Sequence, residues 1–329
     1  MTINLSIIGL NKIGVSIGLA LKNHSQQIIR YGHDRENSKQ KKALELGAFD
    51  QTPGNIFATV ENADIIILSV PVDEIRETIE TIAPRLKPGV VIMDTSPIKK
   101  SVLDMTAELL PEDSYFISFH PTLNPKYFSE QSVDLANAHD DLFKNSYIII
   151  TNSEKTDGDA IKLASDLSRF IGSSPYFADP YEIDGLIAGT EILPELIFAA
   201  YIHSLASQPG WKECQKIAGN SYYALSEPIH NLMERELFGE SAKLNKENTI
   251  RAINNFMYSL RDMRELMENG DWDELHEYIS DAKNTQSDWK NSRIRADWDN
   301  LNDYSEVPSS GDFLLKMIGF GKKRKKPGN

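Results

Sequence analysis

Three features of the sequence could act together on a bound nucleotide: a glycine loop near the N-terminus, a carboxylate after it and a histidine in the middle of the chain. The loop from Gly9 to Gly14 follows an apolar run, and free backbone N–H groups at the start of a following helix would point at a phosphate. Asp34 stands twenty residues after Gly14, where a carboxylate receives the ribose hydroxyls of NAD. His120 ends another apolar run, which suits a crevice at the carboxyl edge of a parallel sheet. The alternatives are a glycine turn without a ligand and a histidine with a structural role.

The loop departs from the usual pattern because Asn11 stands where the middle glycine belongs. Asparagine tolerates a left-handed backbone better than most residues, and its side chain can donate a hydrogen bond. We therefore expect binding of the cofactor that is weakened but not lost, with Ile13 opening the helix. Asp34 repels a 2′-phosphate whereas Arg35 beside it could attract one, so NAD is favoured over NADP and NADP stays possible.

The elements that would position these residues form an α/β pattern up to residue 178. Short apolar strands alternate with amphipathic helices, as in a Rossmann-type doubly wound parallel sheet with helices on both faces. Strands are predicted at 4–10, 27–33, 64–70, 89–95, 115–120, 147–151 and 175–179, and helices near 13–23, 36–46, 73–83, 99–109 and 155–171.

The chain then changes character, and residues 179–295 are predicted to form an all-helical second domain. Apolar residues recur at spacings of three and four from Ile250 to Met267, giving a stripe wider than one helix needs. We expect a second copy of the chain to bury this stripe, so that the helical domain makes a homodimer. The alternative is a helical bundle that buries the stripe within one chain. Residues 296–329 are expected to be a flexible tail that ends in a polybasic run at 322–326.

The composition of the 329-residue chain limits the classes of partner that it can bind. A net charge of -13 argues against nucleic acid, which is a polyanion, and the basic tail is either solvated or touches an anionic surface. Cys214 is the single cysteine, and no Cys/His spacing suggests a metal site. No apolar run looks long enough for a membrane span, so a cytoplasmic protein with a small-molecule substrate is expected.

The assembled motifs resemble the prephenate and arogenate dehydrogenase family over about residues 1–290. The resemblance implies a Rossmann domain followed by a helical dimerisation domain, and oxidative decarboxylation of prephenate or arogenate with hydride passing to NAD(P) on the way to tyrosine. In that family the histidine of the His-Pro motif, here His120, accepts or polarises the ring hydroxyl. The matching segments include "YGHDRENSKQKKALELGAFD", "ADIIILSVPVDEI", "LKPGVVIMDTSPIKKSV", "FISFHP", "DGLIAGTEILPELI" and "NGDWDELHEYISDAK". Within them Val70, Pro71 and Thr95 are expected to line the cofactor site.

Several site positions depart from the family pattern. Pro97 stands where the family has serine, so Ser96 becomes the candidate for the catalytic hydroxyl. Ile192 and Glu195 stand where the family has two histidines, and a looser alignment puts Glu227 or a neighbour where the family has a substrate-binding arginine. A carboxylate opposite a dianion should cost more than the roughly 2–5 kcal/mol of a lost charge pair, so prephenate is predicted to be a poor substrate.

Two functions remain open on these residues. One is a dehydrogenase of the prephenate type, whose substrate could carry an amine paired with Glu191, Glu195 or Glu227. The other is a non-catalytic NAD-binding paralogue that acts as a regulatory or binding module. A 2-hydroxyacid or imine reductase is a more distant possibility. Such enzymes usually carry a catalytic lysine on the first long helix after the sheet, and no lysine occurs here between residues 179 and 211.

Overall fold

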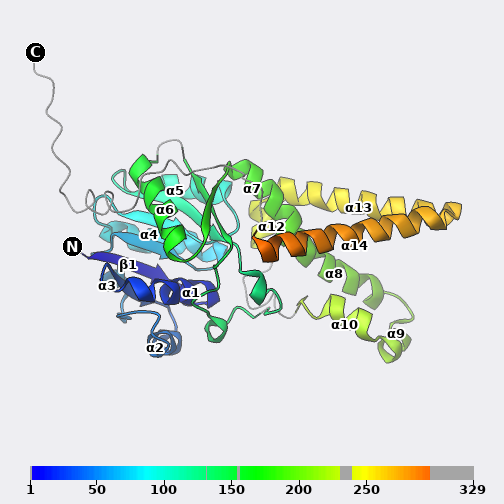
Figure 1. Cartoon of the computed structure of the whole chain (residues 1–329), viewed down its shortest axis with the longest axis horizontal. Helices are drawn as coiled ribbons and strands as arrows, with labels where there is room; N and C mark the ends of the chain where they lie inside the picture. Colours follow the sequence, from blue (N-terminus) through cyan, green and yellow to red (C-terminus); the bar gives the residue numbers. More distant parts are fainter. Residues whose placement is uncertain (1, 131, 154–155, 230–238, 297–329) are drawn as a thin grey trace, which may run out of the picture.

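A computed structural model of the chain describes residues 2–130, 132–153, 156–229 and 239–296. Its N-terminal part contains a seven-stranded sheet in the order β2-β1-β3-β4-β5-β6-β7 (Figure 1). Each predicted strand is present, with ends within two residues of the prediction. The strands are β1 (Ile3–Ile8), β2 (Ile28–His33), β3 (Ile65–Leu68), β4 (Val91–Asp94), β5 (Tyr115–Pro121), β6 (Tyr147–Asn152) and β7 (Ser174–Phe177).

The prediction of a wholly parallel sheet is wrong at one place, because β5 and β6 pair antiparallel, with His120 opposite Ile149. Two neighbouring strands can run parallel only if a crossover connection returns the chain to the opposite end of the strands. Between these strands the chain forms only short 3₁₀ helices in its described residues, at Pro125–Tyr127 and Leu135–Asn137. The second of these lies against helix α1. Since this connection stays near the carboxyl edge of the sheet, β6 begins where β5 ends.

Helices cover both faces of the sheet, as the near-continuous apolar strands require. One core lies between the sheet and helices α1 and α6, and the other lies under α4, α5 and the first helix of the second domain, α7 (Pro180–Ile187). The predicted helices are confirmed, and one short helix, α3, was not predicted. Their bounds are α1 (Lys12–Ala20), α2 (Asn37–Glu45), α3 (Ile56–Val60), α4 (Ile75–Ile82), α5 (Lys100–Leu109) and α6 (Gly158–Phe170).

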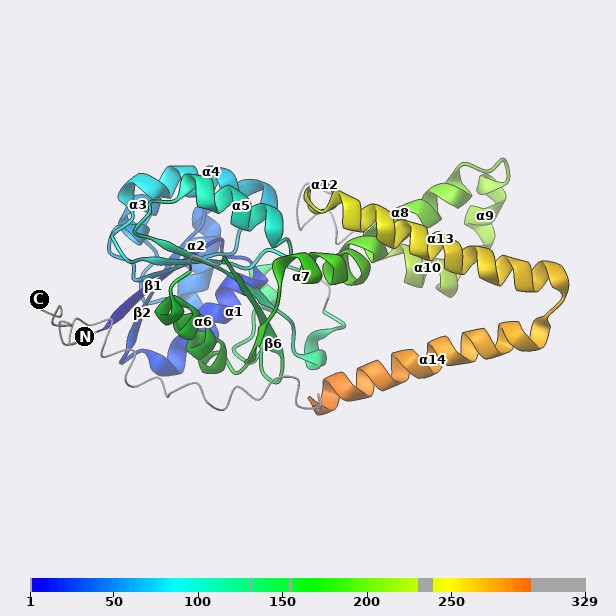
Figure 2. The ribbon, with the colours of Figure 1, turned by 90° about the horizontal axis from the view of Figure 1, so that it is seen from above.

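The second part of the chain is helical, as predicted. It begins after Asp179, whose carboxylate caps the next helix by accepting from the backbone N–H groups of Tyr181 and Glu182. Figure 2 shows that α8 and the pair α13 and α14 extend away from the sheet. The predicted tail at 296–329 lies, apart from Ala296, outside the described residues. The helices are α7 (Pro180–Ile187), a π-helical turn (Ala188–Ile192), α8 (Leu193–Ala206), α9 (Trp211–Ile217), α10 (Asn220–Ser226), α12 (Glu240–Leu244), α13 (Lys246–Asn269) and α14 (Trp272–Arg295).

The predicted apolar stripe on α13 is open to solvent in the single chain. Ile250, Met257, Leu260 and Met267 are each exposed, and the remaining members, Ile253, Phe256, Met263 and Leu266, are only half-buried. The sheet domain does not cover the stripe, because α13 leads away from it (Figure 2).

One stretch among the described residues, Pro180–Ala206, is long and apolar enough to cross a membrane. This corrects the expectation that no such run exists. Length and composition are weak evidence for a span, and the stretch carries Glu191 and Glu195, which face a cavity described below. Only 17% of the most apolar part of the stretch is buried, so this helix also lacks a cover within one chain.

Candidate active site

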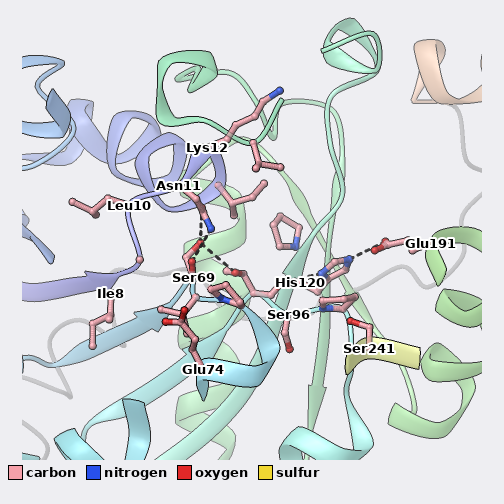
Figure 3. Close-up of a pocket in the computed structure, with 18 of the residues that line it drawn as sticks. Ile8, Leu10, Asn11, Lys12, Ser69, Glu74, Ser96, His120, Glu191 and Ser241 are labelled. Carbon is pink, nitrogen blue, oxygen red and sulfur yellow. Dashed lines mark hydrogen bonds and ion pairs between the residues drawn. The ribbon is translucent and has the colours of Figure 1, made fainter. Parts of the chain in front are cut away.

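A cavity of about 930 Å³ lies at the carboxyl edge of the sheet, where the sheet domain meets α8 (Figure 3). It extends from the glycine loop after β1 to His120 at the end of β5. Carboxyl edges of doubly wound sheets commonly hold the ligand. The predicted residues that line it are Gly9, Asn11, Ile13, Asp34, Arg35, Val70, Pro71, Thr95, Ser96 and His120. Gly14, the other predicted cofactor residue, does not line the cavity and lies buried beneath the loop.

The two outer glycines of the loop have no room for a side chain. Gly9 has a φ of +94°, and a Cβ atom there would lie 2.3 Å from the carbonyl oxygen of Ser69. A Cβ atom on Gly14 would lie 2.2 Å from the carbonyl oxygen of Gly9. The loop therefore turns sharply against β3 and brings the start of α1 to the cavity, which is the geometry that a phosphate needs.

Asn11 caps α1 in place of the missing glycine. Its Oδ1 accepts a hydrogen bond from the Gly14 N–H at 3.0 Å, and its Nδ2 donates to the Ser69 carbonyl at 2.7 Å. Its φ is −84°, so the tolerance of asparagine for a left-handed backbone is not needed here, whereas its side chain does donate a hydrogen bond. Ser69, which the sequence did not single out, also donates its hydroxyl to Asn11 Oδ1 at 3.0 Å.

Asp34 stands at the end of β2 and holds the loop from the other side. One carboxylate oxygen accepts from the Leu10 N–H and the other from the Glu36 N–H, at 2.8 and 2.9 Å. Each carboxylate oxygen has a second lone pair. Asp34 can thus order the glycine loop and still accept a ribose hydroxyl.

Arg35 pairs with two carboxylates at the start of α4. Its guanidinium lies 3.4 Å from Glu74 and 3.1 Å from Glu77. All three residues line the cavity. The cation that could attract a 2′-phosphate is therefore surrounded by negative charge.

A buried lysine joins the loop to the segment between β5 and β6. Lys12, inside the glycine motif, is 4% exposed, and its Nζ lies 3.3 Å from the Glu130 carboxylate. The Glu130 carboxylate also bonds His139 at 2.9 Å, and its pKa is lowered chiefly by that hydrogen bond. This wall of the cavity was missed, because nothing in the sequence pairs residues 118 positions apart.

His120 lies at the centre of the site. Its Nδ1 is 3.0 Å from the carbonyl oxygen of Thr95, and its Nε2 is 3.3 Å from a carboxylate oxygen of Glu191 (Figure 3). Its side chain is 11% exposed, whereas that of Glu191 is 46% exposed. The ring is thus held at the floor of the cavity by the turn after β4 and by the helical domain.

The hydroxyl of Ser96 is engaged below the cavity. It donates to the buried carboxylate of Asp94 and also lies 3.2 Å from the Ile98 carbonyl. Lys99 follows with an exposed fraction of zero, and its Nζ donates to the Ser96 carbonyl. Ser96 therefore helps to hold this turn, and an approach to substrate would require its hydroxyl to leave Asp94.

Two buried charges of opposite sign lie under this turn. Burial raises the pKa of the Asp94 carboxyl, and burial lowers the pKa of the Lys99 ammonium, each against the attraction of the other. The Asp184 carboxylate from α7 caps α5 by accepting from the Lys99 and Lys100 N–H groups at 2.8 and 3.0 Å. The base of the site is thereby tied to the helical domain.

The positions that depart from the family pattern divide into two sets. Pro97, Ile192 and Glu195 line the cavity, and Ile192 is only 5% exposed because it packs into the core beneath. Glu227 does not line the cavity, and its hydrogen bond raises the pKa of Tyr223. The neighbour of Glu227, Pro228, does line the cavity. Within the described residues, no group of three or more His, Cys, Asp or Glu side chains could hold a metal ion.

Two family models match the chain in succession. The first, "Prephenate dehydrogenase, nucleotide-binding domain", covers residues 17–174, and the second, "Prephenate dehydrogenase, dimerization domain", covers residues 179–281. The chain belongs to the prephenate dehydrogenase family. Its sheet domain is the nucleotide-binding domain of that family and its helical part is the family's dimerization domain.

Relatives in the family include the prephenate dehydrogenase of Bacillus subtilis (strain 168), 30% identical over 199 residues, 59% of this chain and 52% of the relative. The cyclohexadienyl dehydrogenase of Zymomonas mobilis is 28% identical over 194 residues, 59% of this chain and 64% of the relative. The matched region thus spans between half and two thirds of these relatives.

Solved structures of family members share the fold over most of the chain. Prephenate dehydrogenase from A. aeolicus, in complex with hydroxyphenyl propionate and NAD+, has a TM-score of 0.76 at 23% identity, covering 88% of this chain and 98% of that one. Synechocystis arogenate dehydrogenase has a TM-score of 0.70 at 22% identity, covering 87% and 100%. The two-domain architecture is therefore that of the family.

Proposed function

We propose that the protein is an NAD-dependent dehydrogenase that takes a hydride from a cyclohexadienyl substrate, prephenate or arogenate. The observation that carries the proposal is that the glycine loop and His120 open into one cavity. A cofactor on the loop and a substrate at the histidine would then lie side by side. The match to the family's nucleotide-binding domain includes His120 and begins at residue 17, just after the glycine loop.

The loop fits the pyrophosphate of NAD. Gly9 and Gly14 leave no side chain in the turn, and the N-terminus of α1 brings the positive end of the helix dipole to the cavity. Asp34 would accept the ribose hydroxyls, while Val70, Pro71 and Thr95 would line the nicotinamide end. When bound, NAD supplies the hydride acceptor.

His120 would handle the hydroxyl proton. As hydride leaves the carbon, the hydroxyl on that carbon becomes a carbonyl and its proton needs an acceptor. Thr95 fixes the ring through Nδ1, so Nε2 is the nitrogen that faces the cavity. Ser96, the other catalytic candidate, would support the turn through Asp94 and act on His120 only indirectly.

The lining favours a substrate that carries an amine. Among the described residues, the lysines and arginines that line the cavity are Lys12, Arg35 and Lys39, all at the cofactor end. Glu191 and Glu195 line the end near His120. Carboxylates attract an ammonium group, and arogenate carries an ammonium group that prephenate lacks, so we infer that arogenate is preferred to prephenate.

A homodimer would complete the helical part. The stripe on α13 and the apolar helix from Pro180 to Ala206 lack a cover in the single chain, and the family's dimerization domain spans both. A second copy would bury these surfaces together. A membrane is then unnecessary for the helix, in agreement with a cytoplasmic protein.

The test is to titrate NAD and NADP separately by calorimetry, and then to measure NADH production from prephenate and from arogenate. NAD binding with faster turnover of arogenate supports the proposal. His120→Asn should abolish turnover and leave the affinity for NAD intact. Absence of heat and of a thermal shift at millimolar NAD would refute the cofactor assignment.

The alternative, a non-catalytic NAD-binding module, is favoured by the engagement of Ser96 with Asp94 and by the buried apolar side chain of Ile192. NAD binding without turnover of either compound would support this alternative.

A further inference from the structure

The last two turns of α14 contact the connection between β5 and β6. Figure 2 shows α14 returning from the far end of α13 toward the sheet domain. Arg293, near the end of α14, is only 8% exposed, and its guanidinium donates to the Leu123 carbonyl at 2.6 Å. Trp289, one turn earlier, stacks on Phe128 with the ring centroids 5.6 Å apart and the planes inclined by 6°. The helical domain therefore holds this connection at two points.

The guanidinium of Arg293 makes a directional contact with the connection. It also lies 5.6 Å from the centre of the Phe128 ring. Burial lowers the pKa of the Arg293 guanidinium, against the attraction of Tyr147, and taking a cation out of water costs free energy unless polar partners replace the water. Because the N–H groups of a guanidinium point in fixed directions, this contact fixes the place of the Leu123 carbonyl, which an apolar side chain would not do.

The connection also forms one wall of the cavity. We call residues 122–130 and 132–142 the wall segment. Its described residues form only short 3₁₀ helices, so its position depends on contacts with its neighbours more than on regular structure of its own. The residues of the wall segment that line the cavity are Leu123, Glu130, Ser132 and Val133.

On its other side the wall segment is bonded to α1. The N–H of Lys12, the first residue of α1, donates to the Val133 carbonyl at 2.9 Å. The Lys12 ammonium lies 3.3 Å from the Glu130 carboxylate, and the His139 N–H donates to the Ser16 hydroxyl at 3.0 Å. The wall segment thus connects the end of α14 to the glycine loop, where the pyrophosphate would bind.

We propose that Arg293 and Trp289 are positioning residues for the cofactor, which hold the wall segment in place against the glycine loop. This rests on the proposed dehydrogenase function. Loss of their contacts would loosen the wall segment and, through Val133 and Glu130, the start of α1. NAD would then bind to a less ordered site and pay more to order it. His120 keeps its contacts with the turn after β4 and with the π-helical turn, so the hydride-transfer step in the loaded enzyme is little affected.

The first test is calorimetry with NAD together with steady-state kinetics on the full-length protein. Arg293→Met should weaken NAD binding by about threefold to tenfold, the worth of one hydrogen bond. The KM for NAD should rise with it while kcat stays nearly unchanged. Arg293→Lys keeps a donor and should recover part of the affinity.

The matched control is Arg295→Met, which removes the same charge from an exposed position two residues along the same helix and should leave NAD affinity unchanged. An equal loss in this control, or a lower melting temperature of Arg293→Met with unchanged NAD affinity, would overturn the proposal.

Hydrogen–deuterium exchange on the cofactor-free protein gives a second readout that needs no ligand. Arg293→Met and Trp289→Ala should each speed exchange in the wall segment and at the start of α1. Exchange in α4, on the other face of the sheet, should match the wild type and thereby verify the fold. Trp289→Ala decides if Arg293→Met does not fold, and unchanged exchange in the wall segment would overturn the proposal. If the wild type binds no NAD, the proposed function fails, while the exchange still decides whether α14 positions the wall segment.

Discussion

Asn11 and Ser69 are joined by two hydrogen bonds across 58 residues of sequence: the amide of Asn11 donates to the Ser69 carbonyl, and the Ser69 hydroxyl donates back to the amide oxygen. The same oxygen caps α1 through the Gly14 N–H. The residue that interrupts the glycine motif is thus a structural part of the loop. It fixes the turn to β3 while occupying space that a glycine would leave to the pyrophosphate.

This arrangement predicts opposite effects on stability and binding. Asn11→Ala removes the cap and both bonds to Ser69, so the free energy of unfolding should fall by about 1–2 kcal/mol. Asn11→Gly costs less as a cap and opens the loop, so NAD should bind more tightly. Urea unfolding and calorimetry with NAD measure the two effects. An unchanged dissociation constant in Asn11→Gly would mean that the loop never closes on the pyrophosphate.

The ion pairs of Arg35 predict the preference between NAD and NADP. Replacing both Glu74 and Glu77 by glutamine frees the guanidinium for a 2′-phosphate, so the affinity for NADP should rise about tenfold, the modest size expected of exposed ion pairs. The affinity for NAD should stay the same. Glu80→Gln, on the same helix and paired with Arg76, is the control. An equal gain in NADP affinity in Glu80→Gln would show that the effect depends only on the net charge of the protein.

The strands and most of the helices of the sheet domain could be predicted because each buried strand is a continuous apolar run with a helix of regular periodicity after it. The antiparallel direction of β6 could not be predicted, because an apolar run does not reveal in which direction its strand runs in the sheet. In the site, His120 and Asp34 were found because their types and positions follow a known motif. The contacts of Glu191 with His120, of Ser69 with Asn11 and of Glu130 with Lys12 join distant parts of the chain, such as the 71 residues that separate His120 from Glu191, and so could not be predicted.

The uncovered stripe on α13 predicts a homodimer in solution. Light scattering should report twice the 37.0 kDa monomer mass for the full chain, and twice its own smaller monomer mass for a shorter version that ends at Asp299. Met257→Lys should shift the protein toward monomer, because Met257 is 59% exposed on the stripe and a charge there would be buried in the dimer. Asn255→Lys, which adds the same charge on the opposite face of α13, should stay dimeric. A monomeric full-length wild type would refute the dimer.

The buried charges Lys99 and Asp94 predict a large effect on stability. Lys99→Met leaves Asp94 without its opposite charge in the interior, and the loss of one partner of a buried pair typically costs about 3–5 kcal/mol. Combining it with Asp94→Asn removes both charges, so part of the loss in the free energy of unfolding should be recovered. Urea unfolding of the two single variants and the double variant measures the coupling, and purely additive losses would contradict a direct interaction.

The pH dependence of Lys99→Met follows from the direction of the Asp94 shift. Burial raises the pKa of Asp94 in the folded protein, and removing Lys99 raises it further because the attraction to the ammonium is lost. A carboxyl whose folded pKa lies above its unfolded value binds more protons when folded, so its contribution to stability improves as the pH falls through the folded pKa. The cost of Lys99→Met should therefore be largest at neutral pH and smaller toward about pH 5, still above the unfolded value of roughly 3.9. A cost that is constant over this range would show that Asp94 is already protonated at neutral pH, and that no buried ion pair lies beneath the site.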